Sequence, residues 1–367
     1  MDVYICKNCL LIQLNEYESA ENIFSNYAYL SSFSDTWLKH ASDYVEKIVP
    51  LLNISKNSFV VEIASNDGYL LQYFVSKNIP VLGIEPASNL SEIANQKGVP
   101  TLASFFGAAL ATRLKQEGKI ADLIIGNNVL AHVPNINDFI AGLKIILKPK
   151  GVITIEFPHL MSLIEKVEFD TIYHEHFSYF SFSTAEKIFA ANGLAIFDVE
   201  ELPTHGGSLR IFVKHDIDYF KGISQSVYKL KEKEVKSGYT NLKFYLNFGE
   251  TVSKKKEAIL NFITMAKKEN KSIVGYGAPA KGNTLLNYCG IGKDLIDYTV
   301  DRNPHKQGRY LPGTHIFIDR PEKIRQTRPD YILILPWNIK DEIIEQLSFI
   351  REWGGKFIIP IPELTVI

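Results

Sequence analysis

The chain has little of several features that mark specialised protein classes. Only Cys6, Cys9 and Cys289 are cysteines among 367 residues, too few for a disulfide framework. The formal net charge of -1 argues against a general nucleic-acid binder. No apolar run approaches the roughly 18 to 20 residues of a membrane span, and the first residues lack a signal-peptide pattern. These absences predict a cytoplasmic, soluble protein that binds neither nucleic acid nor a membrane.

The chain is instead rich in core-forming residues, and its first half reads as an α/β fold. Hydrophobic residues make up 46% of the sequence, enough for two or three domains. A helical region is expected over residues 17–50. Apolar, β-branched runs then alternate with helical stretches, which predicts a mostly parallel sheet. The expected strands are Ser58–Ile63, Pro80–Ile84, Asp122–Ile125 and Gly151–Glu156, followed by an antiparallel edge of Leu194–Leu202 and Ser208–His215.

The second half repeats the α/β pattern after a charged helical stretch. Residues 222–270 show helical apolar spacing with lysines between, which predicts a helical connector. A second α/β unit begins at Lys271. Its expected strands are Ser272–Tyr276, Asp297–Val300, Tyr331–Leu335 and Lys356–Ile359.

Polar residues follow the strands of the first sheet, where parallel sheets bind ligands. The first strand ends in Ala64-x-Asn66-x-Gly68 with Asp67 in the loop, and lacks the glycines that let a pyrophosphate approach a helix. A cationic sulfonium with an amino-acid tail fits this acidic turn better. Glu85 ends the next strand, where an acidic side chain can accept hydrogen bonds from ribose hydroxyls. The cofactor-binding candidates are Glu62, Ala64, Asn66, Gly68, Glu85, Pro86 and Asn128.

The segment Tyr173-His174-Glu175-His176 concentrates acid–base groups directly after the first sheet's parallel strands. Imidazole titrates near neutral pH, and a neighbouring carboxylate or phenol can tune or orient it. A His/Glu/His metal site is a minor alternative, because no third ligand motif accompanies it. No bound metal is predicted there.

Several motifs, in order along the whole chain, resemble the S-adenosylmethionine-dependent sugar C-methyltransferases that act on nucleotide-linked keto-deoxysugars. The resembling stretches are Cys6–Cys9 with Leu11–Leu14, Asn26–Ser32, Asn128–Pro134, Tyr173–His176, His205–Arg210 and Gly275–Asn283. The turn Val60–Gly68 resembles the first motif of class I S-adenosylmethionine-dependent methyltransferases in general, whose usual pattern has glycine where Ala64 stands. The resemblance implies a class I methyltransferase Rossmann-like core, a C-terminal Rossmann-like α/β domain and a small N-terminal segment. The expected boundaries are 1–30 for the N-terminal segment, 31–221 for the core, 222–270 for the connector and 271–367 for the C-terminal domain.

The resemblance also implies a chemistry for the acid–base segment. C-methylation next to a ketone needs a base that removes a proton and donors that stabilise the enolate oxygen. His176 is the expected base, and Glu175 orients it or binds a sugar substituent. Tyr173, Tyr27 and His132 are expected to stabilise the enolate, relay protons or contact the sugar. For Tyr27 and His132, purely structural roles as a core aromatic and a helix cap stay open.

The C-terminal unit carries a second motif that can mark a dinucleotide site, a substrate site or a purely structural Rossmann-like lobe. Gly275-x-Gly277-x-x-Ala280 after a strand fits a dinucleotide fingerprint, which alone suggests an NAD-dependent sugar-nucleotide oxidoreductase. The resemblance implies instead that this domain helps to hold the nucleotide-diphosphate sugar. An O- or N-methyltransferase and a non-catalytic scaffold are further alternatives, and no oligomeric state is predicted. The expected substrate contacts are Arg210, Lys281, Asn283, Arg302, Trp337 and Asn338.

The cysteines at the start depart from the family pattern. The family's N-terminal zinc module usually has two C-x-x-C pairs, and this chain has only the pair Cys6 and Cys9. A structural zinc site normally needs four ligands. The pair is therefore either two ordinary thiols or half of a zinc site, and we predict no bound zinc.

Overall fold

The computed structural model describes residues 2–27, 29–219 and 221–367. Met1 and Ala28, which belong to the predicted N-terminal segment, and Phe220 lie outside the described residues. The chain forms two compact units, each continuous in space but not in sequence. The first consists of Met1–His159 with His174–Thr240, and the second of Leu160–Tyr173 with Asn241–Ile367. The predicted boundaries at 30, 221 and 270 stay predictions.

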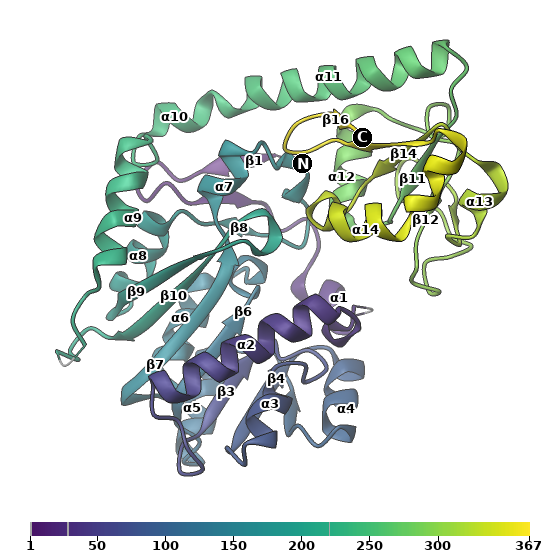
Figure 1. Ribbon diagram of the computed structural model, residues 1–367. Helices are drawn as coiled ribbons and strands as arrows, with labels where there is room; N and C mark the ends of the chain where they lie inside the picture. Colours follow the sequence, from purple (N-terminus) through teal and green to yellow (C-terminus); the bar gives the residue numbers. More distant parts are fainter. Residues whose placement is uncertain (1, 28, 220) are drawn as a thin grey trace. The chain divides into compact units, whose positions relative to one another are not determined.

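The first unit is built on a seven-stranded sheet in the order β5-β4-β3-β6-β7-β10-β9 (Figure 1). Neighbouring strands from β5 to β7 are parallel, and β10 is antiparallel to both β7 and β9, as predicted. The strand order reverses between β3 and β6, where parallel sheets bind ligands. The strands are β3 (Val60–Ile63), β4 (Val81–Glu85), β5 (Thr101–Ala103), β6 (Ala121–Asn127), β7 (Leu147–Pro158), β9 (Leu194–Leu202) and β10 (Ser208–His215).

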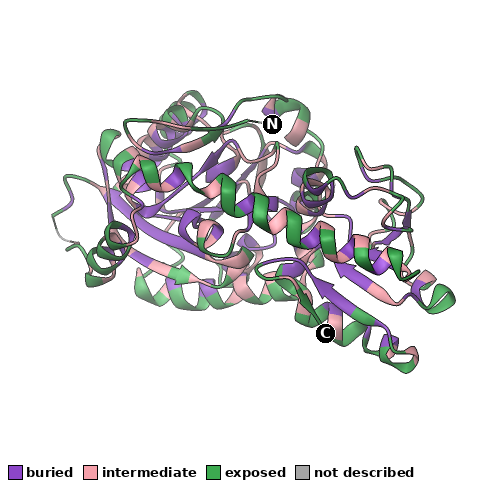
Figure 2. Cartoon of the chain, turned by 90° about the horizontal axis from the view of Figure 1, so that it is seen from above, coloured by how far each residue is buried: buried purple, intermediate pink, exposed green. Residues whose placement is uncertain are grey.

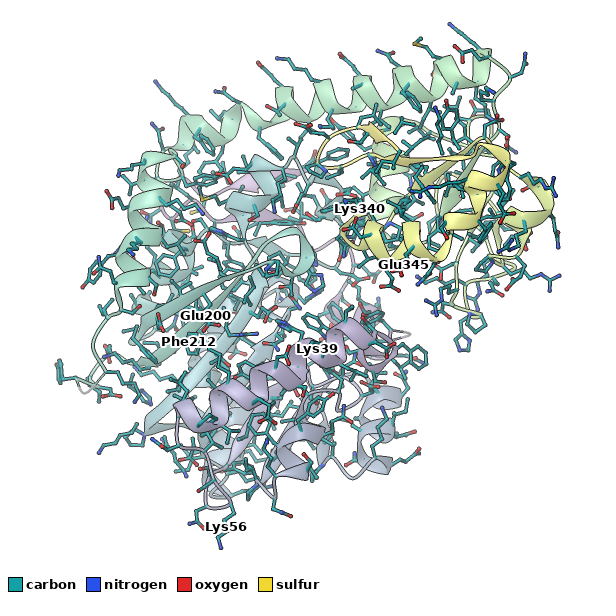
Figure 3. The ribbon with its side chains drawn as sticks, in the orientation of Figure 1. Lys39, Lys56, Glu200, Phe212, Lys340 and Glu345 are labelled. Atoms are coloured by element: carbon teal, nitrogen blue, oxygen red, sulfur yellow. The ribbon has the colours of Figure 1, made fainter. Side chains whose placement is uncertain are left out.

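Helices cover both faces of this sheet because successive strand residues alternate between two cores. Val60 and Leu123 pack with helix α2, whereas Val61 and Ile124 pack into the opposite core. Buried strands and outward-facing exposed helix residues are visible in Figure 2, and Phe212 of β10 and Glu200 of β9 are labelled in Figure 3. The helices are α1 (Ala20–Phe24), α2 (Asp35–Leu51), α3 (Leu71–Ser76), α4 (Ser88–Gln96), α5 (Ala108–Gln116), α6 (Ile136–Ile146), α8 (Phe182–Ala191) and α9 (Gln225–Lys236).

Local sequence explains where α2 begins and which face it buries. Ser34 caps it by accepting a hydrogen bond from the Trp37 N–H at 3.3 Å. Ala41, Val45 and Ile48 recur at helical spacing and are buried against the sheet. The prediction of one helical region over 17–50 is wrong in its middle, because the described residues between α1 and α2 form no helix other than the short 3-10 helix η1 (Ser31–Phe33).

A small antiparallel sheet accompanies the main sheet in the first unit. Strands β1 (Val3–Ile5), β2 (Ile12–Leu14) and β8 (Ser178–Tyr179) pair in that order. The strand β8 directly follows the acid–base segment, so pairing with β2 fixes the downstream end of that segment. Further 3-10 helices are η2 (Leu130–His132) and η4 (Thr204–Gly206).

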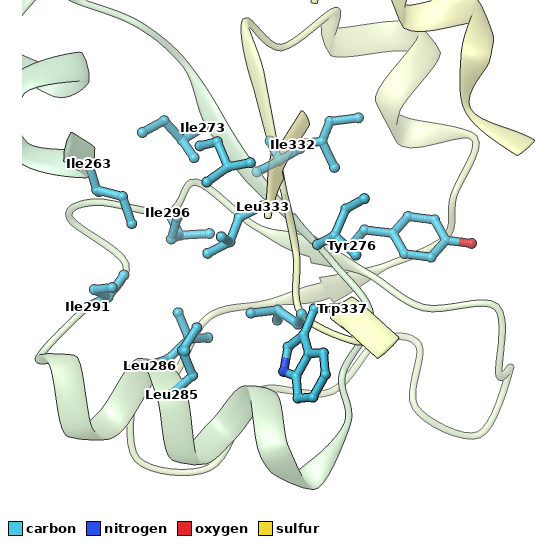
Figure 4. Close-up of a cluster of buried hydrophobic side chains, with 14 of the residues drawn as sticks. Ile263, Ile273, Tyr276, Leu285, Leu286, Ile291, Ile296, Ile332, Leu333 and Trp337 are labelled. Atoms are coloured by element: carbon cyan, nitrogen blue, oxygen red, sulfur yellow. The ribbon is translucent and has the colours of Figure 1, made fainter. Parts of the chain in front are cut away.

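The second unit is a six-stranded sheet in the order β13-β12-β11-β14-β15-β16, parallel except for β16. Its core gathers residues such as Ile273, Leu286 and Ile332 (Figure 4). The strands are β11 (Ile273–Tyr276), β12 (Thr299–Val300), β13 (Ile318–Asp319), β14 (Tyr331–Ile334), β15 (Lys356–Ile359) and β16 (Thr365–Val366). The helices are α7 (Leu160–Glu165), η3 (Phe169–Thr171), α10 (Leu242–Leu246), α11 (Phe248–Lys268), α12 (Ala280–Cys289), α13 (Lys323–Thr327), η5 (Trp337–Ile339), α14 (Lys340–Gln346) and η6 (Ser348–Trp353).

Two features of the whole chain bear on its class. Within the described ranges, none of the helices combines the length and apolarity that crossing a bilayer requires. The stretch 222–270 is largely helical, as predicted, but α9 belongs to the first unit whereas α10 and α11 belong to the second.

Candidate active site

A buried carboxylate lies at the end of the first core strand. Glu62 of β3 is fully buried, and neither carboxylate oxygen has a hydrogen-bond partner among the described residues. Burial, together with the nearby carboxylates of Glu85 and Asp67, raises the pKa of Glu62 well above 4.5, and the neighbouring Tyr69 hydroxyl opposes the shift. An unpaired buried carboxylate is costly, and a bound cation would relieve that cost.

The loop after β3 turns sharply through left-handed backbone conformations. Ala64 has φ +58°, Asn66 +51° and Gly68 +79°. A Cβ at Gly68 would lie 3.0 Å from Val99 Cγ2, so both the conformation and the space require glycine there. At Ala64 the chain adopts the left-handed region without glycine.

Glu85 holds this loop in place. Its Oε2 accepts a hydrogen bond from the Asn66 N–H at 2.8 Å, and its Oε1 accepts one from the Ala87 N–H at 2.9 Å. Burial raises the pKa of Glu85, although the same two N–H groups oppose the shift. Pro86 lies half-buried in the turn between β4 and α4. Glu85 thus organises the loop that carries Asn66. The ribose contact expected from sequence stays a prediction.

Two asparagines at the end of β6 differ in their environment. Asn127 is buried beside the Tyr69 hydroxyl, and neither polar atom of its amide makes a hydrogen bond of ordinary geometry within the described part of the chain. Asn128 has φ +54°, donates its N–H to the Glu156 carbonyl at 2.7 Å, and places Nδ2 3.2 Å from His205 Nε2. Sequence reasoning chose Asn128 and passed over Asn127, although both close the same strand.

These groups fit a cationic amino-acid-bearing cofactor. The carboxylate oxygens of Glu62 and the side-chain amide of Asn127 lie at the ends of β3 and β6, on either side of the point where the strand order reverses. Glu62 is an acceptor suited to an ammonium or sulfonium charge, and Asn127 offers both a donor and an acceptor. S-adenosylmethionine carries both cations and, when bound, supplies an electrophilic methyl group.

A loop before α2 contacts the cofactor loop. Asn66 Oδ1 accepts a hydrogen bond from the Ser31 N–H at 3.0 Å, and Asn66 Nδ2 donates to the Tyr29 carbonyl at 3.1 Å. The Tyr27 backbone is held by Asn89 through two hydrogen bonds of 3.1 and 2.8 Å. Asn66 is therefore a structural link as well as a cofactor candidate.

The same loop reaches the acid–base segment. The Tyr27 hydroxyl donates a hydrogen bond to Glu175 Oε2 at 2.9 Å. The His176 and His132 rings meet edge to face with centroids 4.8 Å apart. The structure thus brings together four of the five predicted catalytic residues within the first unit.

The remaining members of the segment are His174 and Tyr173. His174 is exposed and packs edge-on against Tyr17, with centroids 5.7 Å apart. Tyr173 is half-buried and belongs to the second unit. Residues 174–175 form a turn, so the two histidines do not share a strand face. Across the described residues, three or more His, Cys, Asp or Glu side chains nowhere gather as a metal site.

His132 is a neutral neighbour for His176. Burial lowers the pKa of His132 to about 4, against a smaller opposing contribution from the Glu175 backbone. At pH 7 His132 therefore carries no charge. It exerts no charge repulsion on a proton that the adjacent His176 ring takes up.

Arg210 lies in a buried ion pair. Its guanidinium donates to Glu156 Oε2 at 2.7 Å and Glu200 Oε2 at 3.2 Å, and its side chain is only 5% exposed. Burial opposes ionisation of Glu156, but His40, Arg210 and Thr204 together lower its pKa. This geometry gives Arg210 a structural role in the sheet, and the substrate contact expected from sequence stays a prediction.

Three predicted substrate residues meet in the second unit. Lys281 Nζ donates to Asn338 Oδ1 at 2.6 Å and lies 4.5 Å from the centre of the Trp337 ring. Asn283 is on the same helix, α12, with its Oδ1 unpaired among the described residues. Arg302 is separate, with 67% of its side chain exposed and Nη1 3.8 Å from Glu342.

The dinucleotide fingerprint of the second unit has a packing explanation. Gly277 has φ +90°, and a Cβ there would lie 2.7 Å from Pro336 Cδ. Asp301, at the end of the next strand, accepts a hydrogen bond from the Ala278 N–H at 2.8 Å. The glycine and the acidic residue thus both have roles within the loop itself.

Comparisons with known proteins agree with this arrangement. Residues 37–199 match the model of a methyltransferase domain, and residues 203–362 match that of a C-methyltransferase C-terminal domain. The chain is 34% identical to the C-methyltransferase NovU of Streptomyces niveus over 367 residues, which is 100% of this chain and 87% of that protein.

Solved structures resemble about half of the chain. The magnesium protoporphyrin IX methyltransferase of Synechocystis PCC 6803 with bound SAH is 17% identical, with a TM-score of 0.38 over 48% of this chain and 82% of that one. An S-adenosylmethionine-dependent methyltransferase from Clostridium acetobutylicum is 12% identical, with a TM-score of 0.39 over 48% and 92%.

The full-length match and the two domain matches decide between the alternatives that the sequence left open. They favour C-methylation over nicotinamide chemistry, over O- or N-methylation and over a non-catalytic role. The predicted class I methyltransferase core with a second α/β domain is confirmed. The chain belongs to the family of S-adenosylmethionine-dependent C-methyltransferases.

Proposed function

We propose that the enzyme methylates a carbon next to the ketone of a nucleotide-diphosphate-linked keto-deoxysugar. The observation that carries the proposal is the loop before α2. It hydrogen-bonds Asn66 of the cofactor loop through Ser31 and Glu175 of the acid–base segment through Tyr27. Acid–base groups are thereby tied to the site for the methyl donor, as transfer to carbon requires.

His176 is the proposed base in this reaction. A ketone acidifies its α-hydrogen, and the imidazole takes that proton so that an enolate forms. With S-adenosylmethionine bound, the enolate carbon would form a bond to the methyl carbon as the methyl–sulfur bond breaks, and S-adenosylhomocysteine would leave. Neutral His132 and the Tyr27–Glu175 pair surround the base and offer hydrogen bonds for the enolate oxygen or a sugar hydroxyl.

Glu62, Asn127 and the turn from Ala64 to Gly68 are the proposed cofactor contacts in the first unit, with Glu85 and Asn128 fixing their surroundings. In the second unit, Lys281, Asn283 and Asn338 are the proposed contacts to the nucleotide-diphosphate sugar. Their polar atoms suit phosphate and hydroxyl groups. The family resemblance supports this choice of substrate.

The test is a substrate panel with matched variants. Nucleoside-diphosphate-linked 4-keto-6-deoxyhexoses, with thymidine, uridine, guanosine and cytidine, are incubated with S-adenosylmethionine and compared with a free keto-sugar. We expect one nucleotide sugar to gain a methyl group on a carbon beside the ketone, located by NMR. His176→Gln should abolish turnover while S-adenosylmethionine binding, measured by calorimetry, stays within about twofold.

His174→Gln is the matched control, because His174 is an exposed imidazole of the same segment. It should keep turnover within about twofold. Methylation of oxygen or nitrogen, methylation of the free sugar alone, or full activity of His176→Gln would each contradict the proposal.

A further inference from the structure

The turn His205-Gly206-Gly207 lies at the edge of the first sheet where its parallel strands end. It joins β9 to β10, and the first residue of β10, Ser208, pairs with Pro158, the last residue of β7. The strands β3, β6 and β7 are parallel neighbours, so their ends lie along one edge of the sheet. The turn therefore shares this edge with the cofactor candidates at the ends of β3 and β6.

His205 adopts a strained backbone conformation in this turn and stays exposed. Its φ is +53°, in the left-handed region that residues other than glycine seldom adopt. Glycine would relieve the strain, and a turn that only joins two strands has no need of an imidazole there. Strain of this kind is concentrated at functional sites. Because the side chain is exposed, a ligand can reach its ring.

Ring contacts join His205 to the cofactor candidates. Its ring meets the Trp37 ring edge-on with centroids 5.3 Å apart, and Trp37 stacks on Tyr69 with centroids 6.0 Å apart. The Tyr69 hydroxyl neighbours both the Glu62 carboxylate and the Asn127 amide. All of these residues belong to the first unit. Two aromatic rings thus separate His205 from the groups proposed to hold the methyl donor.

A second set of contacts joins His205 to the acid–base cluster. Its Nε2 lies 3.2 Å from Nδ2 of Asn128, which follows β6 and precedes the helix η2 that ends at His132. His205 lies near enough to act on the charge of His132. The His132 ring in turn contacts the ring of His176, with centroids 4.8 Å apart. His205 and the proposed base therefore share His132 as a neighbour.

The proposed reaction needs a donor at the ketone oxygen as well as a base. When His176 takes the proton from the α-carbon, the electron pair of that C–H bond forms the enolate double bond, and the ketone oxygen takes up the negative charge. A hydrogen-bond donor at that oxygen stabilises the charge, and the loss of one such donor can cost about 100- to 1000-fold in rate. Imidazole is a hydrogen-bond donor in both its neutral and its protonated form.

We propose that His205 is a further catalytic residue of this site: its imidazole donates a hydrogen bond to the ketone oxygen of the bound keto-sugar and stabilises the enolate. The inference rests on the proposed function, in which an enolate forms. It deepens that function by assigning one imidazole to each reacting atom. His176 acts on the α-carbon, and His205 acts on the ketone oxygen.

One substitution removes the imidazole and suits the backbone of the turn. In His205→Gly, glycine adopts the positive φ without strain, so the turn should keep its fold, and urea unfolding checks this. Asn53→Gly is the matched control. Asn53 is also exposed, has the same φ of +53° and belongs to the same unit, but lies in the loop that leads into the start of β3.

The full chain is assayed with S-adenosylmethionine and the nucleotide sugar of highest turnover in the panel. We expect kcat to fall roughly 100-fold in His205→Gly, with S-adenosylmethionine affinity within about twofold. Exchange of the hydrogen beside the ketone, measured in D2O with S-adenosylhomocysteine, should fall in parallel, because it also passes through the enolate. Added free imidazole should restore part of kcat in His205→Gly and leave the wild type unchanged. Asn53→Gly should keep both rates.

Unchanged kcat in His205→Gly, or an equal fall in Asn53→Gly, would overturn the proposal. A raised KM with unchanged kcat would also overturn it, because His205 would then contact the substrate away from the ketone. If His205→Gly fails to fold, His205→Asn tests the same imidazole, since asparagine tolerates positive φ.

The exchange assay keeps this proposal apart from the proposed function. A wild-type enzyme that exchanges no hydrogen beside the ketone would remove the enolate and both ideas with it. Exchange at the same rate in the wild type and in His205→Gly would remove only the role of His205.

Discussion

Glu168 destabilises the second unit at neutral pH, so Glu168→Gln is expected to stabilise it. The side chain is 3% exposed, and its Oε1 has no hydrogen-bond partner in the part of the chain that is described. Burial raises its pKa from 4.5 to about 7, with Lys166 and Lys281 opposing the shift and Asp170 adding to it. The folded state therefore binds this proton more tightly than the unfolded chain does.

The sign and size follow from proton linkage. Because the folded pKa is raised, stability falls as the pH rises from about 4.5 to about 7, and the loss is complete above that window. With 1.36 kcal/mol for each tenfold change, the ionised carboxylate costs the folded unit about 3 kcal/mol at pH 8 and about 1 kcal/mol near pH 5. Glutamine is neutral at both pH values, so the variant should gain these amounts.

Hydrogen exchange of the β11 and β14 amides, compared between variant and wild type at each pH, measures the gain. Where exchange follows opening of the second unit, about 3 kcal/mol corresponds to roughly 150-fold slower exchange at pH 8. Glu165→Gln removes an exposed carboxylate from the end of α7 and should change stability by less than about 0.5 kcal/mol. An equal gain at both pH values, or no gain at all, would refute the reasoning.

Three further predictions concern the first unit. Glu62→Gln should stabilise the protein without cofactor at pH 8, because a raised pKa makes the ionised form costly, and should weaken S-adenosylmethionine binding at least tenfold by calorimetry. Gly68→Ala should lower the free energy of unfolding by about 1–2 kcal/mol in urea and should also weaken S-adenosylmethionine binding. Gly118→Ala is the control, because Gly118 also has a positive φ of +75° but has open space around it. It should lower the free energy of unfolding without changing S-adenosylmethionine binding. Arg210→Met should lower the free energy of unfolding by about 3–5 kcal/mol in the same assay, because it leaves the buried Glu156 carboxylate without its arginine partner. Unchanged stability together with a raised KM would instead indicate that Arg210 contacts the substrate.

The sequence predicts several strands well because their signals are local. Ser208–His215 and Lys356–Ile359 are found with the same bounds, since β-branched runs there lie between clear turn signals. Strands β5, β13 and β16 have two or three residues each and lie at the edges of their sheets, where each pairs with one neighbour. No local pattern marks them.

Contacts between distant residues are what the sequence could not supply. Arg210 stands opposite Glu156 and Glu200 only because of the register of β10 with its two neighbours. Likewise, Leu160–Tyr173 follows the last parallel strand of the first unit in sequence but packs in the second. The acid–base segment was visible as a cluster of residue types, whereas its partner Tyr27 lies 148 residues away in the chain.

Removal of the substrate proton tests the central claim most directly. In D2O with S-adenosylhomocysteine, which donates no methyl group, the wild-type enzyme should exchange the hydrogen beside the ketone of the keto-deoxysugar nucleotide for deuterium, as read by NMR. The account predicts that His176→Gln loses this exchange while His174→Gln retains it. Exchange at the wild-type rate in His176→Gln would contradict the account.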